Sequence, residues 1–169
     1  MSGPFGKGSL LSIEPRSKGL GYVASDGAGQ LIDWGGFRSR PGRRAYYRSC
    51  ARTLIRGYGP TYLLLEDCDA PSSHRRAVTK ALIGMIGSDA EKAGVSVISI
   101  RRKDVLKYFC RYDAGSTFEL AEAVCALHPC LRPRLPKPRK PWESEHYSTA
   151  LFEAAARLAA FSKYKKMFH

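Results

Sequence analysis

Three short apolar segments near the start of the chain predict an antiparallel meander. The first covers Leu10–Glu14 and stops at Pro15, which cannot donate a hydrogen bond to a neighbouring strand. The second and third cover residues 21–25 and 30–36. The sequence Asp-Gly-Ala-Gly at 26–29 separates them, and glycine supplies the positive φ that a tight hairpin turn requires. We therefore expect three neighbouring antiparallel strands in this part of the chain.

After these strands the pattern changes to an alternation of helices and strands. Residues 62–66 are apolar at consecutive positions up to Glu66, which is typical of a central strand buried on both faces, and residues 95–100 form a similar segment. Helices are expected at about 44–56, 71–93, 102–110, 118–127 and 143–161, and the proline-rich, basic segment 129–141 is expected to be an extended loop. This order predicts an α/β fold: a five-stranded mixed sheet, with three antiparallel strands followed by βα units and with helices on both faces.

The composition indicates one hydrophobic core and shows a strong positive charge. The 169 residues are 44% hydrophobic, which suits one domain, expected at 10–161 between a flexible lead at 1–9 and a basic tail at 162–169. The net charge of +13 indicates a polyanionic partner, either nucleic acid or an anionic membrane surface. No apolar run approaches the roughly 20 residues that span a bilayer. The five cysteines lack C-x-x-C spacing, which predicts reduced thiols and a cytoplasmic location.

Acidic residues end two of the predicted strands. Glu14 ends the first strand, Glu66 ends the fourth, and Glu145 and His146 lie near the start of the last predicted helix. If the two strands are neighbours, the glutamates meet, and clustered carboxylates are unfavourable without a cation. Carboxylate oxygens are the ligands that Mg²⁺ prefers, and two such ions can activate water and stabilise the leaving oxygen of a phosphodiester. On spacing alone, two solvated strand ends are the simpler interpretation.

An apolar strand, an acidic residue, a proline and a Gly-Tyr pair follow one another in Leu11-Ser12-Ile13-Glu14-Pro15 and Gly19-Leu20-Gly21-Tyr22. This order resembles the opening of RuvC-type Holliday-junction resolvases, which belong to the ribonuclease H-like superfamily. Residues 62–66 are similar to the second acidic strand of that family, 101–107 to the segment after its fifth strand, and 145–151 to its acidic C-terminal helix. The resemblance, over about residues 10–161, implies an endonuclease that uses Mg²⁺ or Mn²⁺ on branched or structured DNA. It also implies a homodimer that places two sites on a symmetric junction, with no membrane partner.

The resemblance implies that Glu14 and Glu66 are catalytic metal ligands. The first ligand of the family is normally aspartate, so Glu14 is a departure, and its side chain reaches about one carbon further. This departure motivates a second interpretation, a domain that holds nucleic acid within a larger assembly without cutting it. A third interpretation is a basic structural protein whose carboxylates only pair with its many Arg and Lys side chains.

The ligands from the last helix stay open. One alignment places His146 and Thr149 at the two family positions, and threonine there is a further departure. A shift by one residue offers Glu145, and Glu153 lies farther along the same helix. Glu145 and His146 are the candidates that complete the catalytic and metal-binding set.

Basic residues near these carboxylates are candidates for contacts with nucleic acid. Two lie in the turn after Glu14, two lie near the start of the helix that follows Glu66, and the others belong to the proline-rich loop. The set is Arg16, Lys18, Arg75, Arg76, Lys137, Arg139 and Lys140. Trp142 and Phe152 are expected in the core.

Overall fold

The computed structural model describes residues 5–69, 75–109 and 116–167. The strands are β1 (Leu10–Pro15), β2 (Gly19–Ser25), β3 (Leu31–Arg38), β4 (Tyr62–Glu66) and β5 (Ser96–Ile100), and the helices are α1 (Arg43–Tyr58), α2 (Ala77–Lys92), α3 (Arg102–Phe109), α4 (Thr117–Leu127), the 3-10 helix η2 (Pro129–Arg134) and α5 (Thr149–Met167). None of the helices in these ranges is long and apolar enough to cross a membrane.

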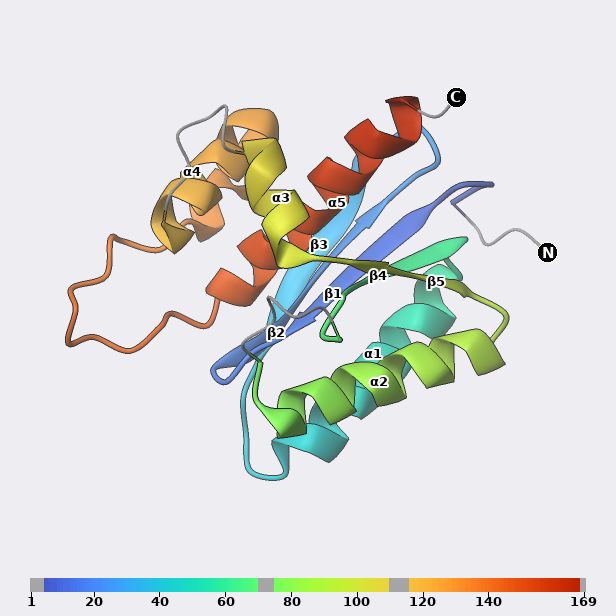
Figure 1. Ribbon diagram of the computed structural model, residues 1–169, viewed down its shortest axis with the longest axis horizontal. Coiled ribbons are helices and arrows are strands. Elements are labelled where there is room, and N and C mark those ends of the chain that lie inside the picture. Colours follow the sequence, from blue (N-terminus) through green and yellow to red (C-terminus); the bar gives the residue numbers. More distant parts are fainter. Residues whose placement is uncertain (1–4, 70–74, 110–115, 168–169) are drawn as a thin grey trace.

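The five strands form one mixed sheet in the order β3-β2-β1-β4-β5 (Figure 1). β2 is antiparallel to both β1 and β3, whereas β4 is parallel to β1 and to β5. Helices α1 and α2 cover one face of the sheet, and α3, α4 and α5 cover the other (Figure 1). The predicted mixed sheet is therefore confirmed, and the first and fourth strands are neighbours.

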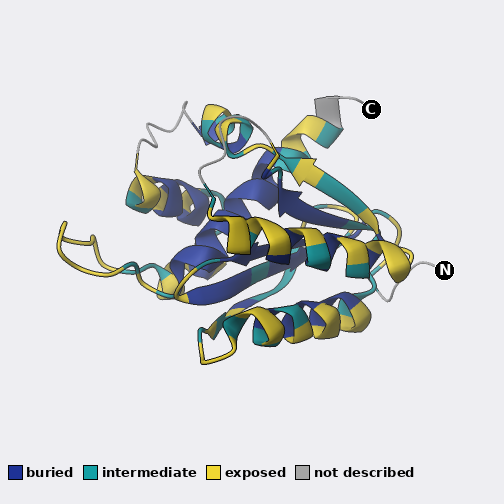
Figure 2. Cartoon of the chain, turned by 60° about the horizontal axis from the view of Figure 1, so that its bottom comes forward, coloured by how far each residue is buried: buried dark blue, intermediate teal, exposed yellow. Residues whose placement is uncertain are grey.

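The alternation of side chains along β1 and β4 decides which way their last residues point. Leu11 belongs to the core beneath α1 and α2, whereas Leu10 belongs to the core beneath α5. Glu14 lies an even number of residues from Leu10 and therefore faces α5. Leu64 also belongs to the α5 core, so Glu66 faces the same way. Figure 2 shows the sheet buried between the two helical layers.

The last helix begins later and ends later than its sequence pattern indicated. It begins at Thr149 instead of 143, because its buried positions start at Ser148 and the polar residues before it have no apolar face to bury. It continues to Met167, through positions that we expected to be a tail. The expected start of the second helix at 71 lies outside the described residues, and α2 is described from Ala77.

The proline-rich segment also differs from the expected loop. Residues 129–134 form η2, because Pro129 suits the first turn of a helix and Leu131 is fully buried in the α5 core. Phe152 is buried as expected, but the expectation for Trp142 is wrong: its side chain is 78% exposed. Trp142 lies outside any helix or strand, so no apolar face carries it into the core.

Gly21 lets α5 approach the sheet closely. It lies on β2, directly opposite Glu14 on β1. A Cβ atom at this position would lie 2.2 Å from both the carbonyl carbon of Ala150 and the backbone nitrogen of Leu151. These are backbone atoms in the first turn of α5, so they cannot rotate away as a flexible side chain would. The missing side chain at position 21 therefore brings the start of α5 next to Glu14.

Gly21→Ala is expected to lower the free energy of unfolding by roughly 2–3 kcal/mol, because overpacking against backbone forces α5 to shift. Urea denaturation followed by circular dichroism measures this change. Gly57→Ala in α1 is the matched control, since a Cβ there meets nothing within 4 Å. Alanine is the better helix former, so this variant is expected to gain about 0.5–1 kcal/mol. Equal stability of the two variants would contradict the close approach of α5.

Candidate active site

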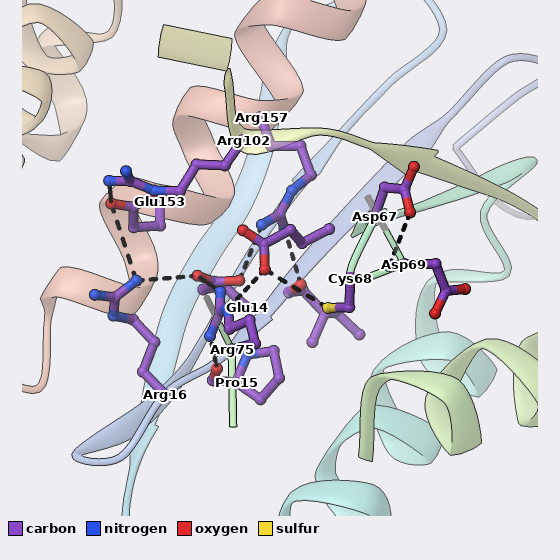
Figure 3. Close-up of polar contacts among 12 residues, drawn as sticks. Glu14, Pro15, Arg16, Asp67, Cys68, Asp69, Arg75, Arg102, Glu153 and Arg157 are labelled. Carbon is purple, nitrogen blue, oxygen red and sulfur yellow. Dashed lines mark hydrogen bonds and ion pairs between the residues drawn. The ribbon is translucent and has the colours of Figure 1, made fainter. Parts of the chain in front are cut away.

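Glu14 and Glu66 meet at the carboxyl ends of β1 and β4. Both are buried, with 1% and 6% of their surface exposed. The parallel register pairs Ser12 with Leu64, so the two glutamates, each two residues further along, lie at the same level and on the α5 face. Figure 3 shows Glu14 at the centre of a network of carboxylates and guanidinium groups. Sequence reasoning expected these two glutamates to meet, and the structure places them together.

Arg75 joins the two glutamates. Its Nε donates to Oε2 of Glu66 at 2.6 Å, its Nη2 donates to Oε2 of Glu14, and its Nη1 donates to the carbonyl oxygen of Pro15 at 2.9 Å. Arg75 lies just before the N-cap of α2, so this contact ties the segment leading into α2 to the ends of both strands. The Nε and Nη2 edge of a guanidinium usually binds both oxygens of one carboxylate. Here two different carboxylates share it.

Arg157 binds Glu14 from the opposite side. It lies on α5, is buried, and donates from Nη2 to Oε1 of Glu14 at 2.9 Å and from Nη1 to the carbonyl oxygen of Ile13 at 3.0 Å. Sequence reasoning missed this residue. Its signal was present as a single cation within the apolar run Ala154–Ala160, where an unpaired charge would be costly to bury.

Two further carboxylates reach the network through Arg16. The Nε and Nη2 atoms of Arg16 donate to Glu145 at 3.0 and 2.6 Å, and its Nη1 donates to Oε2 of Glu14 at 3.2 Å. The same Nη1 lies 4.0 Å from Oε1 of Glu153, which projects from α5. Arg102 binds Glu153 with contacts of 2.8 and 3.3 Å. Glu145 and Glu153 therefore join Glu14 at one edge of the sheet.

The other candidates from the sequence lie outside this network. His146 is exposed, and its Nδ1 lies 2.7 Å from the hydroxyl of Ser148. Thr149 is the buried first residue of α5. The remaining basic candidates are exposed and lie outside the network of ion pairs around Glu14: Lys18, Arg76, Lys137, Arg139 and Lys140.

Burial and charge act in opposite directions on Glu14. Burial alone would raise the pKa of its carboxyl group, but the positive charges of Arg157, Arg75 and Arg16 outweigh that effect and lower the pKa from 4.5 to about 2. Glu14 is therefore ionised at neutral pH although it is buried. The network as a whole joins four carboxylates to four guanidinium groups, and its formal charge is zero.

The donor chemistry of the network fits a divalent cation, because several carboxylates converge and such oxygens are the ligands of Mg²⁺. In the free protein, however, guanidinium groups stand between the carboxylates. No three Asp, Glu, His or Cys side chains within 5–69, 75–109 and 116–167 are grouped closely enough to hold a metal ion. The residues that would hold one are Glu14 and Glu66, with Glu145 or Glu153, once Arg75 leaves its place between the first two.

Comparison with solved structures identifies the fold. Thermus thermophilus RuvC superposes with a TM-score of 0.65 at 19% sequence identity, over 95% of this chain and 96% of that one. The chain has the RuvC fold. T. thermophilus RuvC in complex with Holliday junction substrate gives a TM-score of 0.59 at 16% identity with the same coverage. The yeast mitochondrial Holliday junction resolvase Ydc2 gives 0.50 at 12% identity, over 100% of this chain and 87% of that one.

No protein-family model matches the sequence, and no curated protein matches it either. The likeness to RuvC therefore lies in the fold. The order of strands and helices predicted its five-stranded mixed sheet, and the resemblance of the sequence implied the ribonuclease H-like fold. The strand ends that carry Glu14 and Glu66 are part of this RuvC fold.

Proposed function

We propose that this chain is a divalent-metal-dependent endonuclease that hydrolyses phosphodiesters in branched DNA. The observation that carries the proposal is the convergence of four carboxylates at one edge of a RuvC fold: Glu14 and Glu66 on neighbouring parallel strands, Glu145 before α5 and Glu153 on it. These acids lie far apart in the chain, and the fold brings them together. A structural salt-bridge network does not by itself require two buried acids at the carboxyl ends of neighbouring central strands with two more acids beside them.

Five residues of the network have roles in this proposal. Glu14 and Glu66 hold the cation with Glu153, which we favour over His146 because Glu153 lies within 4.0 Å of the guanidinium bound to Glu14. A divalent cation supplies charge neutralisation at the scissile phosphate and lowers the pKa of an attacking water. Arg16 and Arg75 bind and orient the phosphate, because a guanidinium recognises phosphate as it recognises a carboxylate.

Surface chemistry supports a nucleic-acid substrate. The net charge is +13, and the loop before α5 carries Lys137, Arg139 and Lys140 at exposed positions beside an exposed tryptophan, Trp142. The Lys140 ammonium lies 5.5 Å from the centre of the Trp142 ring. Cations together with an exposed aromatic ring are typical of surfaces that bind nucleic acid strands. A RuvC structure of the same fold is bound to Holliday junction substrate, which supports branched DNA as the substrate class.

The proposal includes a homodimer, because a four-way junction is symmetric and a two-fold dimer presents two equivalent sites to it. Light scattering on the purified protein, alone and with junction, measures the oligomeric state. The mass of two chains plus one junction is the expected result in the presence of junction.

Purified protein is expected to nick a synthetic four-way junction in Mg²⁺ or Mn²⁺ and to leave the linear duplex of the same sequence intact. Chelation of the metal with EDTA is expected to abolish nicking while salt-dependent binding continues, because the phosphate contacts come from Arg and Lys. Denaturing gels with end-labelled strands measure cleavage, and fluorescence anisotropy measures binding. Cleavage that persists in EDTA would contradict a metal-dependent mechanism.

The second candidate is a domain that binds branched nucleic acid without cutting it. The observation that favours it is the pairing of every carboxylate in the network with a guanidinium, including the buried pair of Glu14 and Arg157. Tight, salt-dependent junction binding with no nicking in either metal would establish this function and reject the first. Absence of both binding and nicking would reject both.

A further inference from the structure

The three arginines that pair with Glu14 fall into two kinds. Arg157 is 4% exposed and also donates to the backbone of β1, so it is fixed within the core. Arg75 and Arg16 have side chains that are 15% and 21% exposed, and they approach the carboxylates from the open edge of the sheet. Figure 3 shows Arg16 and Arg157 reaching Glu14 from different sides. A ligand arriving at that edge meets Arg75 and Arg16 but not Arg157.

Arg75 lies between the carboxylates of Glu14 and Glu66, where a positive charge is needed to offset their repulsion. It brings Oε2 of Glu14 and Oε2 of Glu66 to adjacent nitrogens of one planar group. If that guanidinium leaves and nothing replaces it, two buried anionic oxygens face each other across a small gap, which is strongly unfavourable. The departure of Arg75 therefore favours the entry of another cation between the same two oxygens.

A backbone phosphate is the ligand that can draw these arginines away. Arg16 binds Glu145 through two parallel contacts of 3.0 and 2.6 Å, and a phosphate offers the same paired acceptor oxygens. Arg75 binds one oxygen of each of two carboxylates, so a phosphate that binds its Nε and Nη2 replaces both contacts at once. The exchange conserves charge-assisted hydrogen bonds for the arginines. It takes away the arginine partners of Glu66 and Glu145 and leaves Glu14 with Arg157.

We propose that Arg75 and Arg16 are exchangeable counter-ions, which neutralise the carboxylates in the free protein and pass to backbone phosphates when DNA binds. Divalent metal then binds to the carboxylates that they release. This inference rests on the proposed function and adds its regulation: a bound substrate strengthens the metal site. Metal and DNA binding are therefore positively coupled, and each raises the affinity for the other by the same factor.

Binding of Mn²⁺ tests the inference without relying on turnover. Free Mn²⁺ is titrated by electron paramagnetic resonance with protein alone, with junction alone and with the complex on ice, and a gel of each sample shows that the junction is intact. The wild-type protein is expected to bind Mn²⁺ about 5- to 150-fold more tightly in the complex than alone, the range typical of coupled sites. Junction affinity, measured by anisotropy with and without Mn²⁺, is expected to rise by the same factor.

Arg75→Ala gives the second measurement. Without the guanidinium, the free protein is expected to bind Mn²⁺ several-fold more tightly than the wild type, and junction is expected to add little to that affinity. Arg48→Ala is the matched control, because Arg48 also holds a carboxylate through two contacts, 2.8 and 2.9 Å to Asp89, but does so between α1 and α2. Its Mn²⁺ affinity is expected to equal that of the wild type.

The inference is overturned if the wild-type protein binds Mn²⁺ equally well with and without junction, or if a folded Arg75→Ala variant binds it no better than Arg48→Ala. Should Arg75→Ala fail to fold, the comparison of wild-type protein with and without junction decides alone. Cleavage without coupling rejects the exchange and leaves the endonuclease proposal standing. Coupling without cleavage rejects the endonuclease and leaves a metal-linked binding site.

Discussion

Junction cleavage is expected to fall by roughly 10²- to 10³-fold in Glu66→Gln, the range seen when one group that stabilises charge in a transition state is removed. Glutamine keeps the shape of the side chain but removes its negative charge, which a divalent ligand needs. Glu66 is buried beside Glu14, and both accept from Arg75. Loss of this charge also leaves Arg75 with one anionic partner fewer, so junction binding in the absence of divalent metal is expected to hold or to tighten slightly.

Single-turnover cleavage in Mg²⁺ measures the effect of Glu66→Gln on the cleavage rate, and anisotropy on the same preparation measures its effect on junction binding. Asp69→Asn is the matched control: it removes one negative charge close by in the sequence, yet Asp69 is exposed and its side chain points away from the network (Figure 3). Its cleavage rate is expected to stay within about twofold of the wild type, since an exposed charge contributes little. Undiminished cleavage by Glu66→Gln would remove Glu66 from the mechanism.

Arg157→Met is expected to lower the free energy of unfolding by about 3 kcal/mol, because removing one partner of a buried ion pair leaves the other charge poorly compensated. Glu14 keeps its contacts with Arg75 and Arg16, so we expect the lower end of the usual range. For a chain of this length the loss corresponds to a fall in Tm of roughly 6–12 °C. Thermal unfolding followed by circular dichroism measures it.

The same substitution is expected to change the dependence of stability on pH. In the wild type, the pKa of Glu14 is lowered to about 2 from 4.5, so between these values the folded protein binds fewer protons than the unfolded chain. The stability that Glu14 contributes is therefore present above about pH 4.5 and is lost as the pH falls towards 2. Without Arg157 the folded pKa of Glu14 rises, so this contribution shrinks and less stability is left to lose on acidification.

Arg101→Met is the control for both measurements. Arg101 is an exposed arginine that pairs with Asp104 within one turn of chain, and such pairs contribute about 0.5 kcal/mol or less. A loss of unfolding free energy for Arg157→Met no larger than for Arg101→Met would contradict the buried ion pair between Arg157 and Glu14. The comparison matters for function as well, because Arg157 fixes the carboxylate of Glu14 that the proposed metal site uses.

The sequence was a good guide to the sheet and a poor one to the last helix. The strands around Leu64 and Leu11 were recognisable because runs of apolar side chains with the right length leave few alternatives. The start of α5 was placed too early, since the acidic residues before Thr149 suggested the beginning of a helix but have no buried face. Trp142 was misplaced for the related reason that its large apolar side chain follows a segment of prolines and cations and precedes polar residues, so no buried face forms around it.

The sequence alone also determined which residues of the candidate site come from the strands. Glu14 and Glu66 each end a short apolar strand, and parallel pairing of those strands brings their ends together. Only the tertiary structure decided which side chains surround these two acids. Arg157 and Glu153 lie well over a hundred residues from Glu14 along the chain, and no local pattern encodes a contact across that separation. Their placement depends on the packing of α5 against β1 and β2, which the absence of a side chain at Gly21 permits.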